Sequence, residues 1–246
     1  MKIVSSDSAE RDLAAPAVPR AVASPMKVLV TDVMRHRGQF CVAGWGVERH
    51  ATIRLRPLPE RPWPPGLVAE HSIAGGAVIA CEGRPGNPEV DPEDVLFSPG
   101  SLRLVEPAPA PWKSALSLPP APSRVSEAFA GTVRARRVAR GFIHGAHVPA
   151  GAVARSLAGV VVDALRLRFL EGPAGHGLLA RVHDGVFGYI LPVTCHALLS
   201  LHEAAGLDAV NAVASTHRPI HLRLALARPV PRAPDRRAVM VSMLYV

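Results

Sequence analysis

Residues 26–57, MKVLVTDVMRHRGQFCVAGWGVERHATIRLRP, decide the fold of this chain. The stretch reads as β-branched and apolar strands separated by two charged turns. In its last strand, Ile53 and Leu55 alternate with Arg54 and Arg56, which places the two pairs on opposite faces. One face suits a core, and the other carries two guanidinium groups, a pattern typical of a small barrel that meets an anionic partner. The predicted strands are 27–34, 39–46 and 51–58.

The residues that follow complete a five-stranded set. A proline-rich run at 60–66 interrupts the sheet, and residues 67–73 are predicted as a short helix or turn. Strands are predicted at 76–82 and 101–105. Residues 84–100 between them read as a turn-rich loop whose acidic side chains are solvated: Glu89, Asp91, Glu93 and Asp94. Five strands with a short helical connection before the fourth predict an OB-like barrel.

Proline-rich and polar segments divide the chain. Residues 1–25 have no apolar core of a secretory signal and are predicted as a disordered leader. Residues 106–123 (EPAPAPWKSALSLPPAPS) are predicted as a semi-rigid linker. The first barrel is therefore expected over residues 26–105 and a second unit over residues 124–246.

The second unit is also expected to be an OB-like barrel, with one helix. Residues 160–170 form the longest predicted strand, in which Arg166 and Arg168 share one face. Asp184-Gly185 predicts a type I′ hairpin turn. Residues 193–214 predict a helix with a break at Gly206. Two closing strands are predicted at 219–227 and 238–245. The predicted fold class is thus mainly β, with two OB-like barrels in tandem and a few short helices.

The opening stretch also resembles the dual OB-fold-containing domain family of prokaryotic proteins, which are often associated with defence systems. The family pattern is a basic glycine-containing turn, a CVAG strand and a strand ending in Ile-Arg-Pro. The usual aromatic residue before Ile-Arg is absent here, and Leu55-Arg56 are additional. The resemblance implies two OB-like barrels, a nucleic-acid-binding role and no known catalytic residues. The matching residues are Gly38, Cys41, Val42, Ala43, Gly44, Ile53, Arg54 and Pro57.

Composition points in the same direction but allows another interpretation. The chain has 246 residues, a formal net charge of +8 and a pI of about 10.4, which suggests an anionic partner. However, 25 of its 28 basic residues are arginine, as expected also from a GC-rich genome. The three cysteines are scattered, which favours a reducing cytoplasm over a disulfide scaffold or zinc ribbon. No run predicts a transmembrane helix.

The candidate binding residues are arginines that recur at every second strand position, basic turn residues and one tryptophan. Guanidinium groups bind phosphate oxygens bidentately and stack on bases, and an exposed indole stacks on bases as well. The alternative is that these arginines are ordinary polar residues of outer strand faces and that the tryptophan is packed. The candidates are Arg35, Arg37, Trp45, Arg54, Arg56, Arg166, Arg168 and Arg223.

Signals of catalysis are weak. His144 and His147 form an HxxH in a glycine-rich loop rather than on a helix, and Cys195 and His196 are adjacent, which is poor geometry for a mutual hydrogen bond. No nucleotide-binding, hydrolase or metalloprotease motif is present. An enzyme would rest on these residues alone, and we expect no cofactor and no metal.

The expected function is a non-catalytic, cytoplasmic nucleic-acid-binding module, the recognition part of a larger system such as a defence system. Its partner is DNA or RNA, with strandedness left open, and no membrane. The alternative is a protein-interaction subunit that docks a partner enzyme or peptide. Steep salt dependence separates phosphate-led binding from an apolar protein interface.

Overall fold

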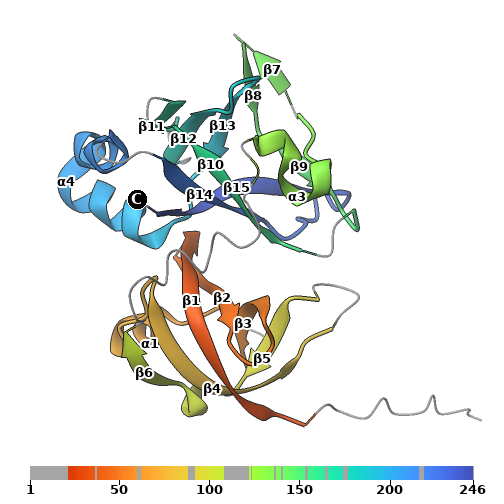
Figure 1. Cartoon of the computed structure of the whole chain (residues 1–246), viewed down its shortest axis with the longest axis vertical. Coiled ribbons are helices and arrows are strands. Elements are labelled where there is room, and N and C mark those ends of the chain that lie inside the picture. The colour runs from red at the N-terminus through yellow and green to blue at the C-terminus, as the bar shows by residue number, and fades with distance from the viewer. Residues whose placement is uncertain are drawn as a thin grey trace, which may run out of the picture.

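The fold is mainly β, with two barrel-like units that contact each other (Figure 1). The computed structural model describes residues 22–36, 38–59, 62–87, 92–107, 122, 124–135, 137–139, 141–152, 155–163, 166–173, 177–215 and 219–245. The predicted leader, except for its last four residues, and most of the predicted linker lie outside these ranges. Within them, no helix is both long and apolar enough to cross a membrane.

The first barrel has the strand order β1-β2-β3-β5-β4, and β1 also pairs with β4, which closes the sheet. The third and fifth strands run parallel, and the other pairs are antiparallel. This arrangement, with helix α1 between the third and fourth strands, is the predicted OB-like barrel. Strand β6 extends the sheet beside β4. The elements are β1 (Ser24–His36), β2 (Gln39–Gly46), β3 (Ala51–Pro57), α1 (Pro65–Glu70), β4 (Ala77–Pro85), β5 (Asp94–Phe97), the 3-10 turn η1 (Pro99–Ser101) and β6 (Arg103–Pro107).

Trp63 fills the core of this barrel. Its ring packs against Phe97 with 4.9 Å between the centroids, and its Nε1 donates to the Leu55 carbonyl at 2.8 Å. A buried indole N–H needs such an acceptor. The apolar residues around it alternate along the strands, as predicted for β3: Val28, Val30, Val42, Ile53, Leu55, Ile79 and Phe97.

The identity of the fifth strand differs from the prediction. Residues 94–97 form β5 inside the stretch that was expected to be a solvated loop, and both Glu93 and Asp94 are buried. Sequence patterns miss β5 because it is four residues long and buried on both faces, so it shows no alternation. The strand predicted at 101–105 is β6, whose Leu104 is exposed.

The second barrel repeats the topology of the first. Strands β10 and β11 together correspond to β1 of the first barrel. Strand β10 pairs with β14 as β1 pairs with β4, and β11 pairs with β12 as β1 pairs with β2. Strands β13 and β15 meet in parallel through Val193 and Val241, as β3 and β5 do. Helix α4 lies between the third and fourth strands. These elements are β10 (Leu157–Val162), β11 (Leu167–Glu171), β12 (Leu178–His183), β13 (Gly188–Pro192), α4 (His196–Ser215), β14 (Ile220–Leu226) and β15 (Arg236–Tyr245).

Short elements before β10 widen the second barrel. Strands β7 and β8 extend the β11-β12-β13 sheet, and β9 pairs with β15. The start of this unit forms two short turns rather than a continuous helix, because Phe129 and Ala130 adopt positive φ angles. The elements are η2 (Val125–Glu127), α3 (Ala128–Gly131), β7 (Arg137–Ala139), β8 (Phe142–His144) and β9 (His147–Pro149).

Helix α4 confirms the predicted helix and covers an edge of the sheet. Its break lies at Gly206, where φ is 78°, as predicted. Asn211 on α4 pairs with the backbone of Phe169 in the edge strand β11. Its Oδ1 accepts from the Phe169 N–H at 2.8 Å, and its Nδ2 donates to the Phe169 carbonyl at 3.2 Å. One side-chain amide thus satisfies the two outward backbone groups of that residue.

Two local predictions for the second barrel are wrong. The predicted strand 160–170 is divided, because the chain turns where the Arg166 N–H donates to the Asp163 carbonyl. The predicted two-residue hairpin turn is a four-residue loop. Asp184 Oδ1 accepts from the N–H groups of Val186 and Phe187, a side-chain-stabilised turn in which Gly185 has a positive φ.

The substitution Gly44→Ala tests the close approach of β1 and β2. A Cβ at Gly44 would lie 2.3 Å from the Leu29 carbonyl oxygen, which belongs to the backbone. We expect the free energy of unfolding to fall by about 1–3 kcal/mol, as at other overpacked sites. Gly46→Ala is the matched control, because its nearest neighbours lie at 3.5 Å. Denaturant unfolding measures both, and equal losses would contradict the close approach.

Candidate nucleic-acid interface

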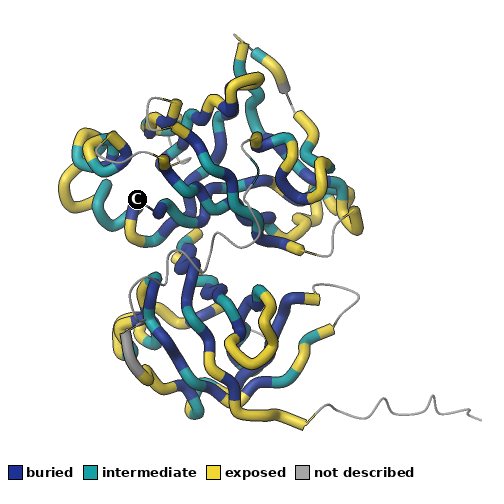
Figure 2. Tube along the Cα trace, in the orientation of Figure 1, coloured by how far each residue is buried: buried dark blue, intermediate teal, exposed yellow. Residues whose placement is uncertain are grey.

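The predicted arginine face of the first barrel is covered by the second barrel. Arg54 points away from Ile53 and Leu55, as the alternation predicts, yet it is only 6% exposed. The apolar part of this junction consists of Met34, Ala43, Leu157 and Ala225, with Cys41 and Met240 packed against them. The expectation that Arg54 faces solvent is therefore wrong, because another part of the chain occupies that side. Figure 2 shows the buried end of β1 at the second barrel.

Three arginines converge on Asp94, which is 5% exposed. Arg54 Nε lies 2.6 Å from Asp94 Oδ1, and Arg56 Nη1 lies 3.2 Å from Oδ2. Arg228 of the second barrel reaches Oδ2 as well, at 2.6 Å from its Nη2. The half-buried Arg56 and the buried Arg54 thus hold a carboxylate that also bridges the two barrels, and they present no open basic face.

Asp32 forms a second bridge and has no exposed surface. Its Oδ1 accepts from Ser242 Oγ at 2.7 Å, and its Oδ2 accepts from Thr31 Oγ1 at 2.6 Å. Arg223 Nη2 lies 3.2 Å from the same Oδ2, so this predicted binding residue pairs with a buried carboxylate of the first barrel. The phenol of Tyr245 donates to the Thr31 carbonyl next to it.

Arg35 also joins the barrels. Its backbone N–H donates to the Thr194 carbonyl at 2.7 Å, and its side chain pairs with Glu203 on α4. Of the remaining first-barrel candidates, Trp45 is half-buried on the outer side of β2, and Arg37 lies outside the described residues. The structure therefore brings Arg35, Arg54 and Arg223 together at the junction of the two barrels.

The second barrel leaves an arginine-rich face open. Arg168 on β11 and Arg181 on β12 lie directly opposite each other, so their side chains leave the sheet on the same side. His183 lies two residues after Arg181 on β12 and leaves the sheet on the same side, and Arg166 lies in the turn immediately before β11. Arg166, Arg168 and His183 are exposed, and Arg181 is partly so. We call these four residues the basic face.

An aromatic ring adjoins the basic face. Phe142 on β8 lies beside Gly188 on β13, where a Cβ would approach the ring to 2.4 Å, so the glycine makes room for it. The Arg181 guanidinium carbon lies over this ring, 5.6 Å from its centroid. A cation held over an aromatic face has fewer orientations available. Phe142 therefore positions the guanidinium of Arg181 on the outer side of the sheet.

Among the described residues, the arginines of the basic face form no ion pair. Like charges directly opposite each other on neighbouring strands destabilise a sheet, and Arg168 faces Arg181 in this way. Within the described ranges, no carboxylate pairs with Arg166, Arg168 or Arg181. This arrangement costs folding free energy that a bound anion would offset.

The surface that is covered on the first barrel corresponds in topology to a surface that is open on the second barrel. OB-like barrels bind oligonucleotides on the face of their second and third strands. In the first barrel these are β2 and β3, where Ala43 and Arg54 are buried against the second barrel. In the second barrel these are β12 and β13, and their outer side carries Arg181 and His183.

The histidine and cysteine candidates form no cluster. Among the residues that the structure describes, no three His, Cys, Asp or Glu side chains are arranged to hold a metal ion. Burial raises the pKa of Cys81 to about 12 and that of Cys195 to about 11. Both thiols are therefore neutral near pH 7, which makes them poor nucleophiles.

Of the predicted residues, Arg166 and Arg168 lie together on an open surface. The remaining residues there, Arg181, His183 and Phe142, were not predicted from the sequence. Arg181 and His183 alternate with the buried Ala180 and Val182, so the period of two was a usable signal. Phe142 had no such signal, because its place depends on the pairing of β8 with β13. Comparison with protein-family models gave no match, and neither did comparison with curated proteins.

The substitution Asp32→Ala tests the bridge between the barrels. It leaves the largely buried Arg223 without its carboxylate, so we expect a loss of about 3–5 kcal/mol in the free energy of unfolding. Asp235→Ala is the control. Its side chain is 77% exposed and 3.9 Å from Arg236, so its loss should stay within about 0.5 kcal/mol. Urea unfolding measures both losses. A similarly small loss with Asp32→Ala would mean that the Asp32–Arg223 pair does not stabilise the fold.

The buried carboxyl group of Glu93 makes the stability of the protein depend on pH. Burial raises its pKa above 4.5, although hydrogen bonds from Ser156 oppose the shift. The folded state therefore holds the proton more tightly than the unfolded state. Its contribution to stability is complete below about pH 4.5 and is lost as pH rises through the raised folded pKa. Glu93→Gln does not titrate, so its stability relative to the original protein should increase from pH 4.5 to 8. A pH-independent difference would contradict this.

Proposed function

We propose that the chain binds nucleic acid through the basic face of its second barrel. The observation that carries the proposal is the direct opposition of Arg168 and Arg181 on the β11-β12 surface, with no ion pair to a described carboxylate. This surface includes part of the one that OB-like barrels use for oligonucleotides. The corresponding surface of the first barrel is buried, so that barrel acts as a support.

Binding is led by phosphate contacts. Guanidinium groups donate two parallel hydrogen bonds to phosphate oxygens, and nearby arginines bring an anionic strand to the sheet. The guanidinium of Arg181, held over Phe142, also offers a flat surface on which a base stacks. In this proposal the chain is the non-catalytic recognition part of a larger system.

A second candidate is the docking of a partner protein. The observation that favours it is Val138, which is 67% exposed on the edge strand β7. An open strand edge accepts an added strand from a partner through backbone hydrogen bonds. Such docking would depend little on salt, whereas phosphate-led binding weakens steeply with it.

Single substitutions in the basic face test the proposal. Fluorescence polarisation with single- and double-stranded DNA and RNA gives the affinity at several salt concentrations. We expect Arg168→Ala and Arg181→Ala each to weaken binding by about 1 kcal/mol across sequences and to reduce the salt slope by about one. Both residues are at least partly exposed and face each other as like charges, so melting temperatures should not fall.

Arg103→Ala is the matched control, because it removes the same charge from an exposed position on β6 of the first barrel. Its affinity should stay close to that of the original protein. An equal loss of affinity with Arg103→Ala would mean that binding depends on the net charge of the protein and not on the position of the arginine. Absence of binding to every nucleic acid would refute the proposed function.

A further inference from the structure

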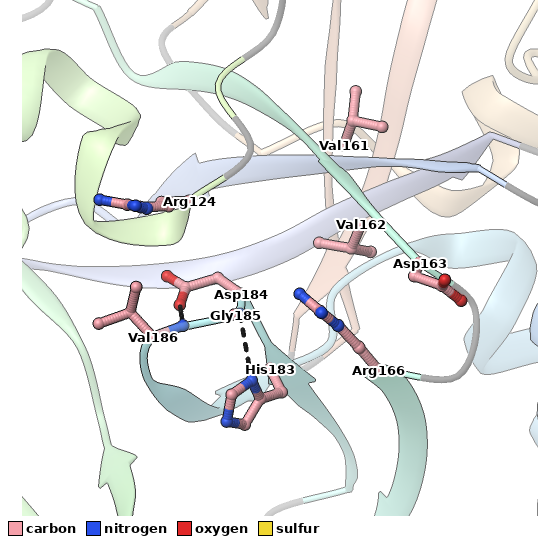
Figure 3. A pocket seen from close by; sticks show the side chains of 9 residues that line it. All are labelled: Arg124, Val161, Val162, Asp163, Arg166, His183, Asp184, Gly185 and Val186. Carbon is pink, nitrogen blue, oxygen red and sulfur yellow. Dashed lines mark hydrogen bonds between the residues drawn. The ribbon is translucent and has the colours of Figure 1, made fainter.

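A cavity of about 240 Å³, partly open to solvent, lies at one end of the basic face. It is formed where the end of β10, the turn into β11 and the β12–β13 loop meet, beside the residue that precedes η2 (Figure 3). Arg166 and His183 belong to both the basic face and this cavity. Its residues are Arg124, Val161, Val162, Asp163, Arg166, His183, Asp184, Gly185 and Val186.

The lining does not suit a phosphate. Two arginines, Arg124 and Arg166, are balanced by two carboxylates, Asp163 and Asp184, so the local charge is close to zero. Three valines supply apolar surface, from which a phosphate would gain nothing. The volume and the mixed polar and apolar walls, with little net charge, suit a neutral, planar group of the size of a nucleobase.

The carboxylate of Asp184 serves the scaffold. Its Oδ1 accepts from the N–H groups of Val186 and Phe187, and its Oδ2 accepts from the Val125 N–H at 3.0 Å. It therefore fixes the hairpin loop to the start of η2 and shapes two walls of the cavity. Arg124 lies on the far side, with its guanidinium turned away from Arg166 and 3.7 Å from Glu127 (Figure 3).

Arg166 is the polar group that a ligand would meet. Its guanidinium extends toward the β12–β13 loop (Figure 3), where a Cβ at Gly185 would lie 2.9 Å from Nη1. Gly185 has a φ of +94°, so glycine provides both the backbone shape and the room for this side chain. The Arg166 guanidinium has no side-chain partner among the described residues. Its N–H groups are thus available to a ligand in the cavity.

We propose that this cavity accepts a guanine base of the bound strand, with the Arg166 guanidinium donating to O6 and N7. Guanine presents two adjacent acceptors on this edge, whereas adenine presents a donor at N6 that would face the guanidinium. The valines contact the faces or edges of the base. The inference rests on the proposed function, because the strand on the basic face delivers the base to the cavity.

The test uses the full chain and short thymidine oligonucleotides in which a single residue is guanine, adenine or cytosine, with the all-thymidine strand as reference. Fluorescence polarisation should show about tenfold tighter binding of the guanine strand. Arg166→Lys keeps the charge and removes the fork of donors, so it should abolish this preference. Arg168→Lys is the matched control and should retain it.

The outcomes separate the two proposals. Equal affinity for all four strands, with binding still weakened by Arg168→Ala, would overturn the guanine site and leave the proposed function standing. Absence of binding to any strand would refute both. A guanine preference that survives Arg166→Lys would also overturn the assignment to this cavity. Circular dichroism of both lysine variants confirms that they are folded, as expected for exposed positions.

Discussion

Buried carboxylates join the two barrels, and Asp32 imposes the strictest condition among them. It has no exposed surface, and groups of both barrels donate to its oxygens. A charge removed from water is tolerated only when its hydrogen bonds and its counterion are in place. Because Ser242 and Arg223 belong to the second barrel, the first barrel cannot keep Asp32 satisfied alone. We therefore expect the two barrels to unfold as one unit.

The same junction determines which surfaces remain for a ligand. Asp94 forms ion pairs with Arg54, Arg56 and Arg228. Arg54 and Arg56 of the first barrel are therefore engaged at the junction and do not form an open basic surface. On the second barrel, Arg166, Arg168 and Arg181 form no ion pair with any carboxylate that the structure describes, and all three are at least partly exposed. Two barrels of one topology thus differ in exposure, because the outer sheet face of the first is buried in the junction and that of the second is not.

Much of the fold could be predicted from the sequence, because local patterns carry it. Alternation in β3 and β14 and the break of α4 at Gly206 are confirmed. Strand β5 was missed, since Asp94–Phe97 is buried throughout and has no period. The burial of Arg54 could not be predicted from local sequence either, because Asp94 and the second barrel, which cover it, are distant in the chain. Local sequence reports which face a side chain takes, and only tertiary packing decides what covers that face.

The pairing of Asn211 with Phe169 has a consequence for how copies of the chain meet. An uncovered edge strand is a template for the strands of other molecules and a starting point for aggregation. The amide of Asn211 occupies the backbone donor and acceptor of Phe169, so an incoming strand would first have to displace α4. At the opposite edge of that sheet, among the described residues of β7, no backbone group bonds to a side-chain amide. Addition of a strand beside Phe169 would therefore require α4 to move, whereas addition at β7 would not.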